Sequence, residues 1–402
     1  MATPIELLDP LLDLVLILVA AKLAGEAATR LGQPAVLGEL LVGIALGPSL
    51  LNLVARTEIV VFLAELGAIV LLFEVGLESD LSELKKAGRQ GAAVAAVGII
   101  APFLAGWAFA LAFVEEGLVA LFIGATLTAT SIGITARVLS DLGRLNLRES
   151  QIVLAAAIFD DIVGLILLSI LVTLASAGVV SVFAILETVV LAIAFVVGSI
   201  IIGTRGWMRI LPLVRNMRVR GVLLVFAFSL ALALAYGAAL IGLATIIGAF
   251  AAGLIFSETE DLEHIERDVK PLADVLVPIF FVSMGTLVNV STFLDPVVLA
   301  MAAALTGIAL ATKAVAGYAV SGASLRRPVI GAGMIPRGEV GIIFAGFGLT
   351  LGVIQEDLYS AILVMVVLTT LVAPPLLKHL LRNVPSESPV SKEPSESAPG
   401  SE

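Results

Sequence analysis

The stretch QIVLAAAIFDDIVGLILLSILVTLASAG, residues 151–178, holds two adjacent carboxylates, Asp160 and Asp161, in a run that is otherwise almost entirely apolar. As an α-helix, a run of this length is long enough to cross about 30 Å of hydrocarbon. Asp160 then lies about 18 Å into the span, near the bilayer midplane. A charge at that depth costs at least about 2.5–3.5 kcal/mol, so we expect both acids to face protein or a water-filled cavity.

Neighbouring residues of a helix point about 100° apart, which predicts different surroundings for the two carboxylates. A fixed positive charge can hold one acid while the other faces a cavity. The alternative is a purely structural role, in which the buried pair holds helices together.

The composition of the chain indicates a helical membrane protein with many spans. Of its 402 residues, 59% are hydrophobic and 14% are charged, against about 25% charged residues in soluble domains. The chain has no cysteine, which excludes disulfides and thiolate sites. Its two histidines, His264 and His379, are far apart in sequence, so we expect no histidine metal cluster. The net charge of −10 gives no sign of nucleic-acid binding.

The apolar runs predict thirteen membrane spans. They cover residues 8–25, 36–52, 58–77, 90–114, 118–141, 148–176, 180–204, 219–238, 239–257, 268–290, 296–322, 328–351 and 357–381.

Lysine and arginine placement predicts the orientation of these spans. With the N-terminus outside, Arg56 is the one basic residue in the outer segments, Lys313 and Arg337 lie inside spans, and the others lie on the cytoplasmic side. This bias favours an external N-terminus and a cytoplasmic C-terminus. We expect the acidic segment 257–270 to be a solvated cytoplasmic linker.

Two of the spans contain signs of an interrupted helix. The fifth contains GATLTATSIGITAR (124–137), which is rich in threonine, and the twelfth contains GAGMIPRGEVGII (331–343), where Pro336 lacks a backbone donor. Freed backbone groups at this depth are tolerated only within protein or beside water. Interruptions at matching places in two oppositely oriented triplets of spans predict an inverted repeat, with a binding site where the breaks meet.

Other charged residues lie at membrane depth or near its edge. Lys313, in the eleventh span, is a candidate partner for one aspartate, or its side chain reaches to the cytoplasmic interface. Arg337 and Glu339 flank the second break, where we expect them to neutralise broken helix ends. Glu74, near the inner end of the third span, is expected at the interface or in a cytoplasmic funnel.

Residues 8–381 resemble NapA-type sodium/proton antiporters, within the monovalent cation:proton antiporter family. The resemblance rests on GQPAVLGELLVGIALGP (32–48), AELGAIVLLFEVGLE (64–78), TATSIGITARVLSDLG (128–143), FDDIVGLI (159–166), PIFFVSMG (278–285), ATKAVAG (311–317) and MIPRGEVGII (334–343).

The resemblance implies an all-α membrane fold of the NhaA/NapA type, with thirteen helices and two broken helices that cross at the midplane. It also implies a homodimer. The implied parts are dimerisation-domain helices at residues 1–89 and 219–293, core-domain helices at 90–177 and 294–382, a linker helix at 178–218 and a disordered cytoplasmic tail at 383–402.

The resemblance also implies roles for individual residues. Asp161 would carry the ion and the proton, Asp160 would pair with Lys313, and Thr130 and Ser131 would line the ion site. The transported Na⁺ would bind Asp161 and Thr130. Two acids with a lysine are found in the electrogenic members of the family, which implies two protons per sodium.

The sequence departs from the family at Glu74, where an apolar residue is common. A change in gating or in the response to cytoplasmic pH would follow. The Asp-Asp pair, and the lack of a nucleotide-binding domain after the last predicted span, argue against nucleotide or glutathione gating.

The functional hypothesis is exchange of cytosolic Na⁺ or Li⁺ for external H⁺ across the cell membrane, without a cofactor. One alternative is K⁺/H⁺ exchange on the same scaffold. Another is a cation channel or a sensor without proton coupling. An enzyme fits poorly, because the sequence shows neither a nucleophile–base set nor a metal cluster.

Overall fold

The computed structural model describes residues 8–79, 81–113, 117–177, 182–215, 217, 219–288, 290, 295–321 and 325–382. The predicted cytoplasmic tail, 383–402, lies outside these residues. The described part is helical, with elements α1 (Leu8–Arg30), α2 (Ala35–Leu46), α3 (Glu58–Glu78), α4 (Leu81–Phe113), α5 (Gly117–Thr126), α6 (Ile132–Asp141), α7 (Arg148–Ala177), α8 (Val182–Arg215), α9 (Val222–Leu240), α10 (Thr245–Ser257), α11 (Leu262–Thr286), α12 (Pro296–Ala316), η2 (Gly317–Ala319), α13 (Arg327–Gly333), α14 (Glu339–Thr350) and α15 (Glu356–Leu381).

The all-helical membrane fold predicted from the sequence is confirmed. Within the described residues, 7 helices are long and apolar enough to cross a membrane, and further apolar helical stretches, one of them within α8, have 10–17 residues. Because these shorter stretches do not reach the length of a full span on their own, the count of thirteen stays a prediction.

Both predicted interruptions are present. The fifth predicted span is divided into α5 and α6 by an extended segment, and the twelfth is divided into α13 and α14. The two extended segments meet, because the backbone N–H of Ser131 donates to the carbonyl of Pro336 at 2.8 Å. The hydroxyl of Thr135 on α6 donates to Gly333 at the end of α13 at 2.7 Å, while α5 packs against α14. The two broken helices therefore cross in antiparallel directions.

A first helix group consists of α1, α2, α3, α9, α10 and α11, which pack mainly on one another. Glycine allows very close packing here: a Cβ on Gly43 would lie 2.2 Å from the carbonyl oxygen of Val282, and one on Gly253 would lie 2.3 Å from that of Phe73. Backbone therefore packs directly against backbone within this group.

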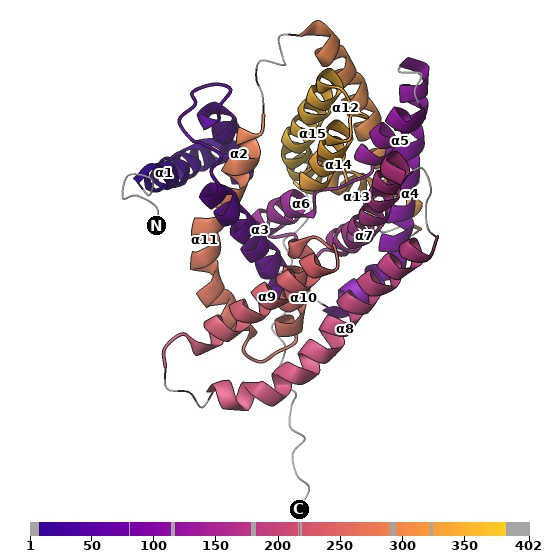
Figure 1. Cartoon of the computed structure of the whole chain (residues 1–402). Helices are drawn as coiled ribbons and strands as arrows, with labels where there is room; N and C mark the ends of the chain where they lie inside the picture. Colours follow the sequence, from indigo (N-terminus) through magenta and orange to yellow (C-terminus); the bar gives the residue numbers. More distant parts are fainter. Residues whose placement is uncertain are drawn as a thin grey trace, which may run out of the picture.

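A second helix group consists of α4, α5, α6, α7, α12, α13, α14 and α15. It contains two triplets, in which α4 packs on α7 and α12 packs on α15 around the broken helices. Figure 1 shows this group beside the first, with the long α8 running along both. At the boundary, α6 packs against α2 and α3, and α15 packs against α2.

The prediction that 257–270 is a solvated linker is wrong in part, because α11 begins within this segment, at Leu262. The physical reason is that apolar residues recur at helical spacing within this charged segment, so that it forms an amphipathic helix. Ile265 and Val269 are 0% and 1% exposed on one face of the helix, while the acidic and basic residues occupy the other.

Candidate functional site

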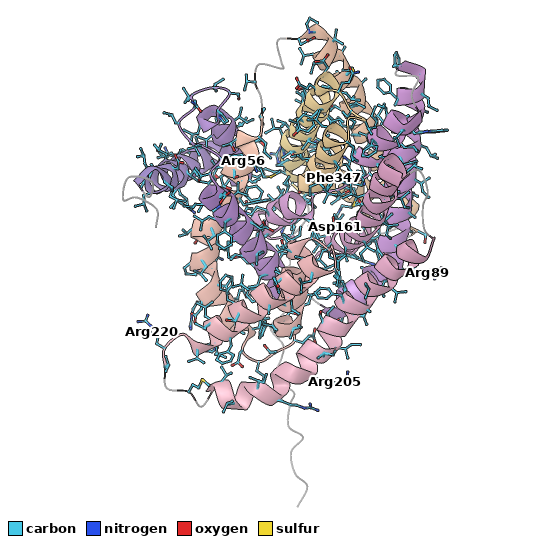
Figure 2. All side chains as sticks on the ribbon, viewed as in Figure 1. Arg56, Arg89, Asp161, Arg205, Arg220 and Phe347 are labelled. Carbon is cyan, nitrogen blue, oxygen red and sulfur yellow. The ribbon has the colours of Figure 1, made fainter. Side chains whose placement is uncertain are left out.

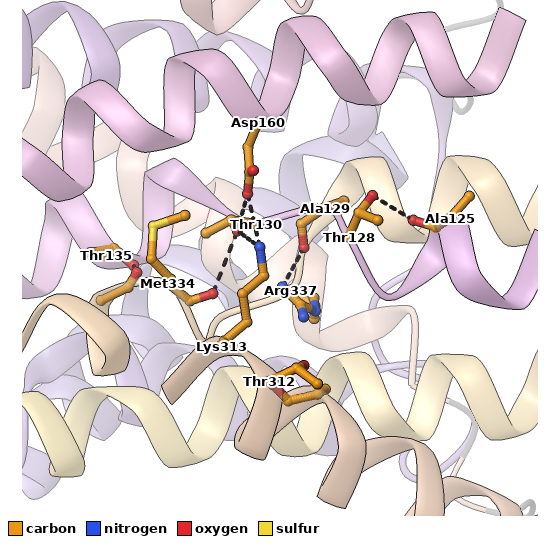
Figure 3. Close-up of polar contacts among 12 residues, drawn as sticks. Ala125, Thr128, Ala129, Thr130, Thr135, Asp160, Thr312, Lys313, Met334 and Arg337 are labelled. Atoms are coloured by element: carbon orange, nitrogen blue, oxygen red, sulfur yellow. Dashed lines mark hydrogen bonds and ion pairs between the residues drawn. The ribbon is translucent and has the colours of Figure 1, made fainter. Parts of the chain in front are cut away.

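The crossing of the two broken helices places Thr130 beside a buried ion pair. Lys313 Nζ on α12 lies 2.9 Å from Asp160 Oδ2 on α7, and it donates to Thr130 Oγ1 at 2.8 Å. Thr130 Oγ1 donates to Asp160 Oδ2 at 2.5 Å. Figure 3 shows these three side chains converging from three elements. The pairing is the one that the family resemblance implies.

These groups are shielded from solvent. Lys313 is 0% exposed, and Thr130 and Asp160 are each 2% exposed. In such surroundings a single charge is costly, whereas a paired charge with hydrogen bonds is tolerated. Lys313 therefore does not extend to the interface, which was the alternative interpretation of its position.

The hydrogen bonds leave oxygen atoms available for a ligand. A threonine hydroxyl has one donor hydrogen and two acceptor lone pairs. Thr130 uses the hydrogen toward Asp160 and one lone pair toward Lys313, which leaves one lone pair. Asp160 Oδ1 and Ser131 Oγ are buried and make no hydrogen bond with any described residue.

Asp161 lies one residue further along α7 and is 4% exposed. On the same helix, Ile158, Ile162 and Ile166 pack toward residues of α9 and α10 in the first helix group. At about 100° per residue, Asp160 points away from this isoleucine face, and Asp161 lies between the two directions. The two acids thus have different surroundings, with Asp161 near the boundary between the helix groups (Figure 2).

Arg337 occupies the second break and is 0% exposed. Its Nη1 donates to the carbonyl of Ala129 at 2.7 Å, just beyond the C-terminal end of α5, where a helix carries partial negative charge. Thr370 on α15 donates to the Arg337 carbonyl at 2.6 Å. The side chain of Glu339, which was also expected to neutralise a broken helix end, lies outside the described residues.

Glu74 is 9% exposed and lies apart from the ion pair. The charges that act on it come from Glu78 on its own helix, Arg137 on α6, and Lys270 and Asp274 on α11. Next to it, Ser140 on α6 donates to Glu78 on α3 at 3.1 Å. Glu74 therefore faces the boundary between the helix groups.

Sequence reasoning missed two residues near the site, of which Thr370 bonds to the backbone of Arg337 and Gly98 lies beside the lysine of the ion pair. Thr370 is distant in sequence from both breaks. Two adjacent threonines in an otherwise apolar helix do not by themselves indicate a functional role. Gly98 on α4 makes room for the lysine, because a Cβ there would lie 3.3 Å from Lys313 Nζ. A glycine among alanines carries no mark of this contact, so only the fold reveals it.

The described residues contain no group of three or more His, Asp or Glu side chains that could hold a metal ion. A cation at this site would have the carboxylates of Asp160 and Asp161 beside it, together with hydroxyl and carbonyl oxygens, and such oxygens suit hard cations. Thr130, Ser131 and the non-helical backbone of the two breaks supply oxygens of this kind.

Comparison with known proteins agrees with this geometry. The profile of the family described as "Sodium/hydrogen exchanger, transmembrane" matches residues 15–383. The chain is 41% identical to the high-affinity Na⁺/H⁺ antiporter NhaS3 of Synechocystis sp., over 97% of this chain and 93% of the relative. It is 39% identical to the Na⁺/H⁺-K⁺ antiporter GerN of Bacillus cereus, over 91% and 95% of the two chains.

The fold is similar to that of the sodium proton antiporter MjNhaP1 of Methanocaldococcus jannaschii. The TM-score is 0.70 at 18% identity, over 92% of this chain and 94% of that one. Two broken helices that cross beside a buried ion pair, the profile match over nearly the whole described chain and these relatives lead to one conclusion. The protein is a multi-pass membrane protein that belongs to the sodium/hydrogen exchanger family.

Proposed function

We propose that this protein exchanges Na⁺ or Li⁺ for H⁺ by alternating access, with Asp161 as the shared carrier of the ion and the proton. The observation that carries the proposal is the different surroundings of the two acids. Asp160 is held by Lys313 at 2.9 Å, whereas Asp161 lies toward the boundary between the helix groups. The relatives NhaS3 and GerN are both named as Na⁺/H⁺ antiporters, which supports the same chemistry here.

Competition at one carboxylate couples the two fluxes. In a medium of low dielectric constant, an unneutralised carboxylate is costly, and a cation beside a carboxyl group that is already neutralised would be an unpaired charge, which is costly in the same way. Asp161 is therefore occupied by a proton or by a cation, and not by both. The Lys313–Asp160 pair would release or take up the second proton of an electrogenic cycle.

The moving part would be the second helix group, sliding against the first, with α8 as the link. Contacts at the boundary between the groups are made by side chains such as Ser140 and Glu78. These contacts break more easily than the backbone packing within the first group. We further propose a homodimer in the cell membrane, with the N-terminus outside and the C-terminus in the cytoplasm.

Potassium is the second candidate ion. GerN, at 39% identity, is named as a Na⁺/H⁺-K⁺ antiporter. The same carboxylate and hydroxyl oxygens bind either ion, and the size of the cavity around them decides which is preferred.

The test is ion-driven proton movement in proteoliposomes, read with a pH-sensitive dye after addition of Na⁺, Li⁺ or K⁺. Asp161→Asn is expected to abolish the response. Asp357→Asn, at an exposed position in the first turn of α15, is the matched control and should respond like wild type. A channel or sensor becomes the better account if no cation moves protons in wild type, or if Asp161→Asn still exchanges.

A further inference from the structure

A cavity of about 560 Å³ opens where the turn between α1 and α2 meets the end of α15 and the turn after α6. We call it the basic pocket. Its lining residues are Gly32, Gln33, Leu142, Arg144, Pro375, Lys378, His379, Leu381 and Arg382. None of these residues is acidic, and three of them carry a permanent positive charge. The volume is typical of a small-ligand site.

The pocket joins the two helix groups. At the end of α1, Gly32 N–H bonds to Thr29 and Gln33 N–H bonds to Ala28, which is a Schellman motif. Gly32 adopts φ +71° in this motif. Its carbonyl accepts a hydrogen bond from Lys378 Nζ on α15. Lys378 thus already reaches across the boundary, from the second group to the first.

Donors remain available in the pocket. A lysine ammonium has three hydrogens, and Lys378 uses one toward Gly32. Arg382 is exposed and adds a planar fork of donors. The side-chain oxygen of Gln33 is buried without a hydrogen bond to any described residue, so this amide can turn its N–H group toward an anion. Arg144, in the turn after α6, also lines the pocket.

Two simpler explanations account for part of this charge. Basic residues gather on the cytoplasmic side of membrane proteins, and they also offset the negative end of a helix such as α15. A helix end carries about half an elementary charge, which Lys378 alone offsets. Neither explanation accounts for positive side chains from separate segments around one cavity without an acidic residue.

A second cavity, beside Arg326 and Arg327, is a weaker candidate. There the backbone N–H of Arg326 already bonds to Glu149 at 3.0 Å, and Arg327 stacks over the ring of Tyr318 at 5.9 Å. That cavity also lies within the second helix group alone. It therefore lacks both the available donors and the bridging position.

We propose that the basic pocket binds a phosphate group, carried by an anionic lipid headgroup or by a soluble phosphate. The bound phosphate joins the α1–α2 turn to α15 and stabilises the arrangement seen here. Any cycle in which the two helix groups slide past each other is then slowed, because these bonds must break first. This second step rests on the proposed alternating-access function, whereas the binding step does not.

Binding is tested by thermal unfolding of the full chain in detergent. The added probes are inorganic phosphate, phosphatidylglycerol, and phosphatidylcholine with chloride at matched ionic strength. We expect phosphate-dependent stabilisation of wild type, weakened about tenfold or more in apparent affinity by Lys378→Gln with Arg382→Gln. The matched control, Arg205→Gln with Arg220→Gln, removes two exposed charges that do not line the pocket (Figure 2 shows both side chains) and should behave like wild type.

The two probes distinguish the source of the phosphate. Stabilisation by phosphatidylglycerol alone identifies a lipid headgroup, and stabilisation by inorganic phosphate identifies a soluble ligand. The binding proposal is overturned if neither probe stabilises wild type, if the pocket variant is stabilised equally, or if the control variant loses the effect. None of these readings depends on transport.

The slowing is tested in proteoliposomes with and without the phosphate source that binds. Wild type should exchange several-fold more slowly with the source present, and the pocket variant should be unaffected. Binding without slowing overturns the joining role. A wild type that moves no protons under any condition refutes the proposed exchange function and leaves the binding result intact.

Discussion

Among single residues, Thr130 connects several groups of the site through its hydroxyl. It bonds to both members of the Lys313–Asp160 pair and lies 3.4 Å from the carbonyl of Met334. A group with these partners fixes the positions of both charges at once. It can also offer its remaining lone pair to a cation.

Thr130→Val keeps the shape of the side chain and removes the hydroxyl. Hydrogen bonds to charged groups are worth about 1.5–3 kcal/mol, so Na⁺-driven exchange should fall about tenfold or more. Thr130→Ser should retain most of the activity. Thr126→Val is the control, because Thr126 bonds only within its own helix, to Phe122, in the contacts described. Equal losses in Thr130→Val and Thr126→Val would assign the effect to packing instead.

The ion pair itself should show strong coupling between its two members. Lys313→Met leaves Asp160 buried without its cation, which costs about 3–5 kcal/mol and should lower the unfolding temperature in detergent. Adding Asp160→Asn to Lys313→Met removes the lone charge and should restore most of this loss. A double variant no more stable than Lys313→Met would show that the pair adds nothing to stability.

The sequence suggested these residues for different reasons. Two acids and a lysine in apolar helices are visible because charge is rare there. The family resemblance indicated which acid contacts the lysine, because helical geometry alone was compatible with either acid. The contact of Gly98 with Lys313 could not be predicted, because it depends on how α4 and α12 lie side by side.

Among the elements, the crossing of the broken helices depends on glycine at position 338, where a side chain would not fit. A Cβ on Gly338 would lie 2.7 Å from Ser131 Oγ and 2.8 Å from Ser131 Cβ. Because Ser131 N–H bonds to Pro336, pushing Ser131 away would also disturb the hydrogen bond that joins the two breaks.

Gly338→Ala should therefore destabilise the protein by about 1–3 kcal/mol, the usual cost of overpacking, and should strongly reduce exchange. Gly341→Ala, three residues further along α14, is the matched control, because its Cβ would make ordinary contacts at 3.7 Å. Thermal unfolding and proteoliposome exchange measure both effects. The close approach at the crossing would be unimportant if the two variants behaved alike.

The breaks were predictable as elements, because Pro336 and the threonine-rich stretch disfavour continuous helix. The crossing was expected from the repeat argument and the resemblance. The start of α11 was not predicted, because the many charged residues of this segment obscure the helical spacing of Ile265 and Val269. Long-range packing, and not local propensity, decides these details.

For the whole molecule, the chain offers a direct test of movement between the helix groups. It has no native cysteine, so introduced thiols are unique. Glu78→Cys with Ser140→Cys places thiols across the boundary, where the native side chains lie 3.1 Å apart. A short bifunctional thiol reagent should join them and stop exchange, since the sliding movement needs this contact to break.

The matched control is Glu65→Cys with Thr245→Cys, whose native side chains lie 3.2 Å apart between α3 and α10 within the first group. Joining this pair should leave exchange unchanged. Equal inhibition by both cross-links would mean that the two groups do not move as proposed. Exchange that continues across a complete Glu78–Ser140 cross-link would exclude the movement altogether.

The glycine packing of the first helix group also has a mechanical consequence. Where backbone touches backbone, as at Gly43 and Gly253, there is no side chain to rotate and absorb strain, so these helices act as a stiff frame. The compliance of the molecule is concentrated at the side-chain contacts around α6. Thinning or stretching the surrounding bilayer would strain these side-chain contacts first. Membrane tension would then change the rate of exchange at a lower tension than is needed to unfold the protein.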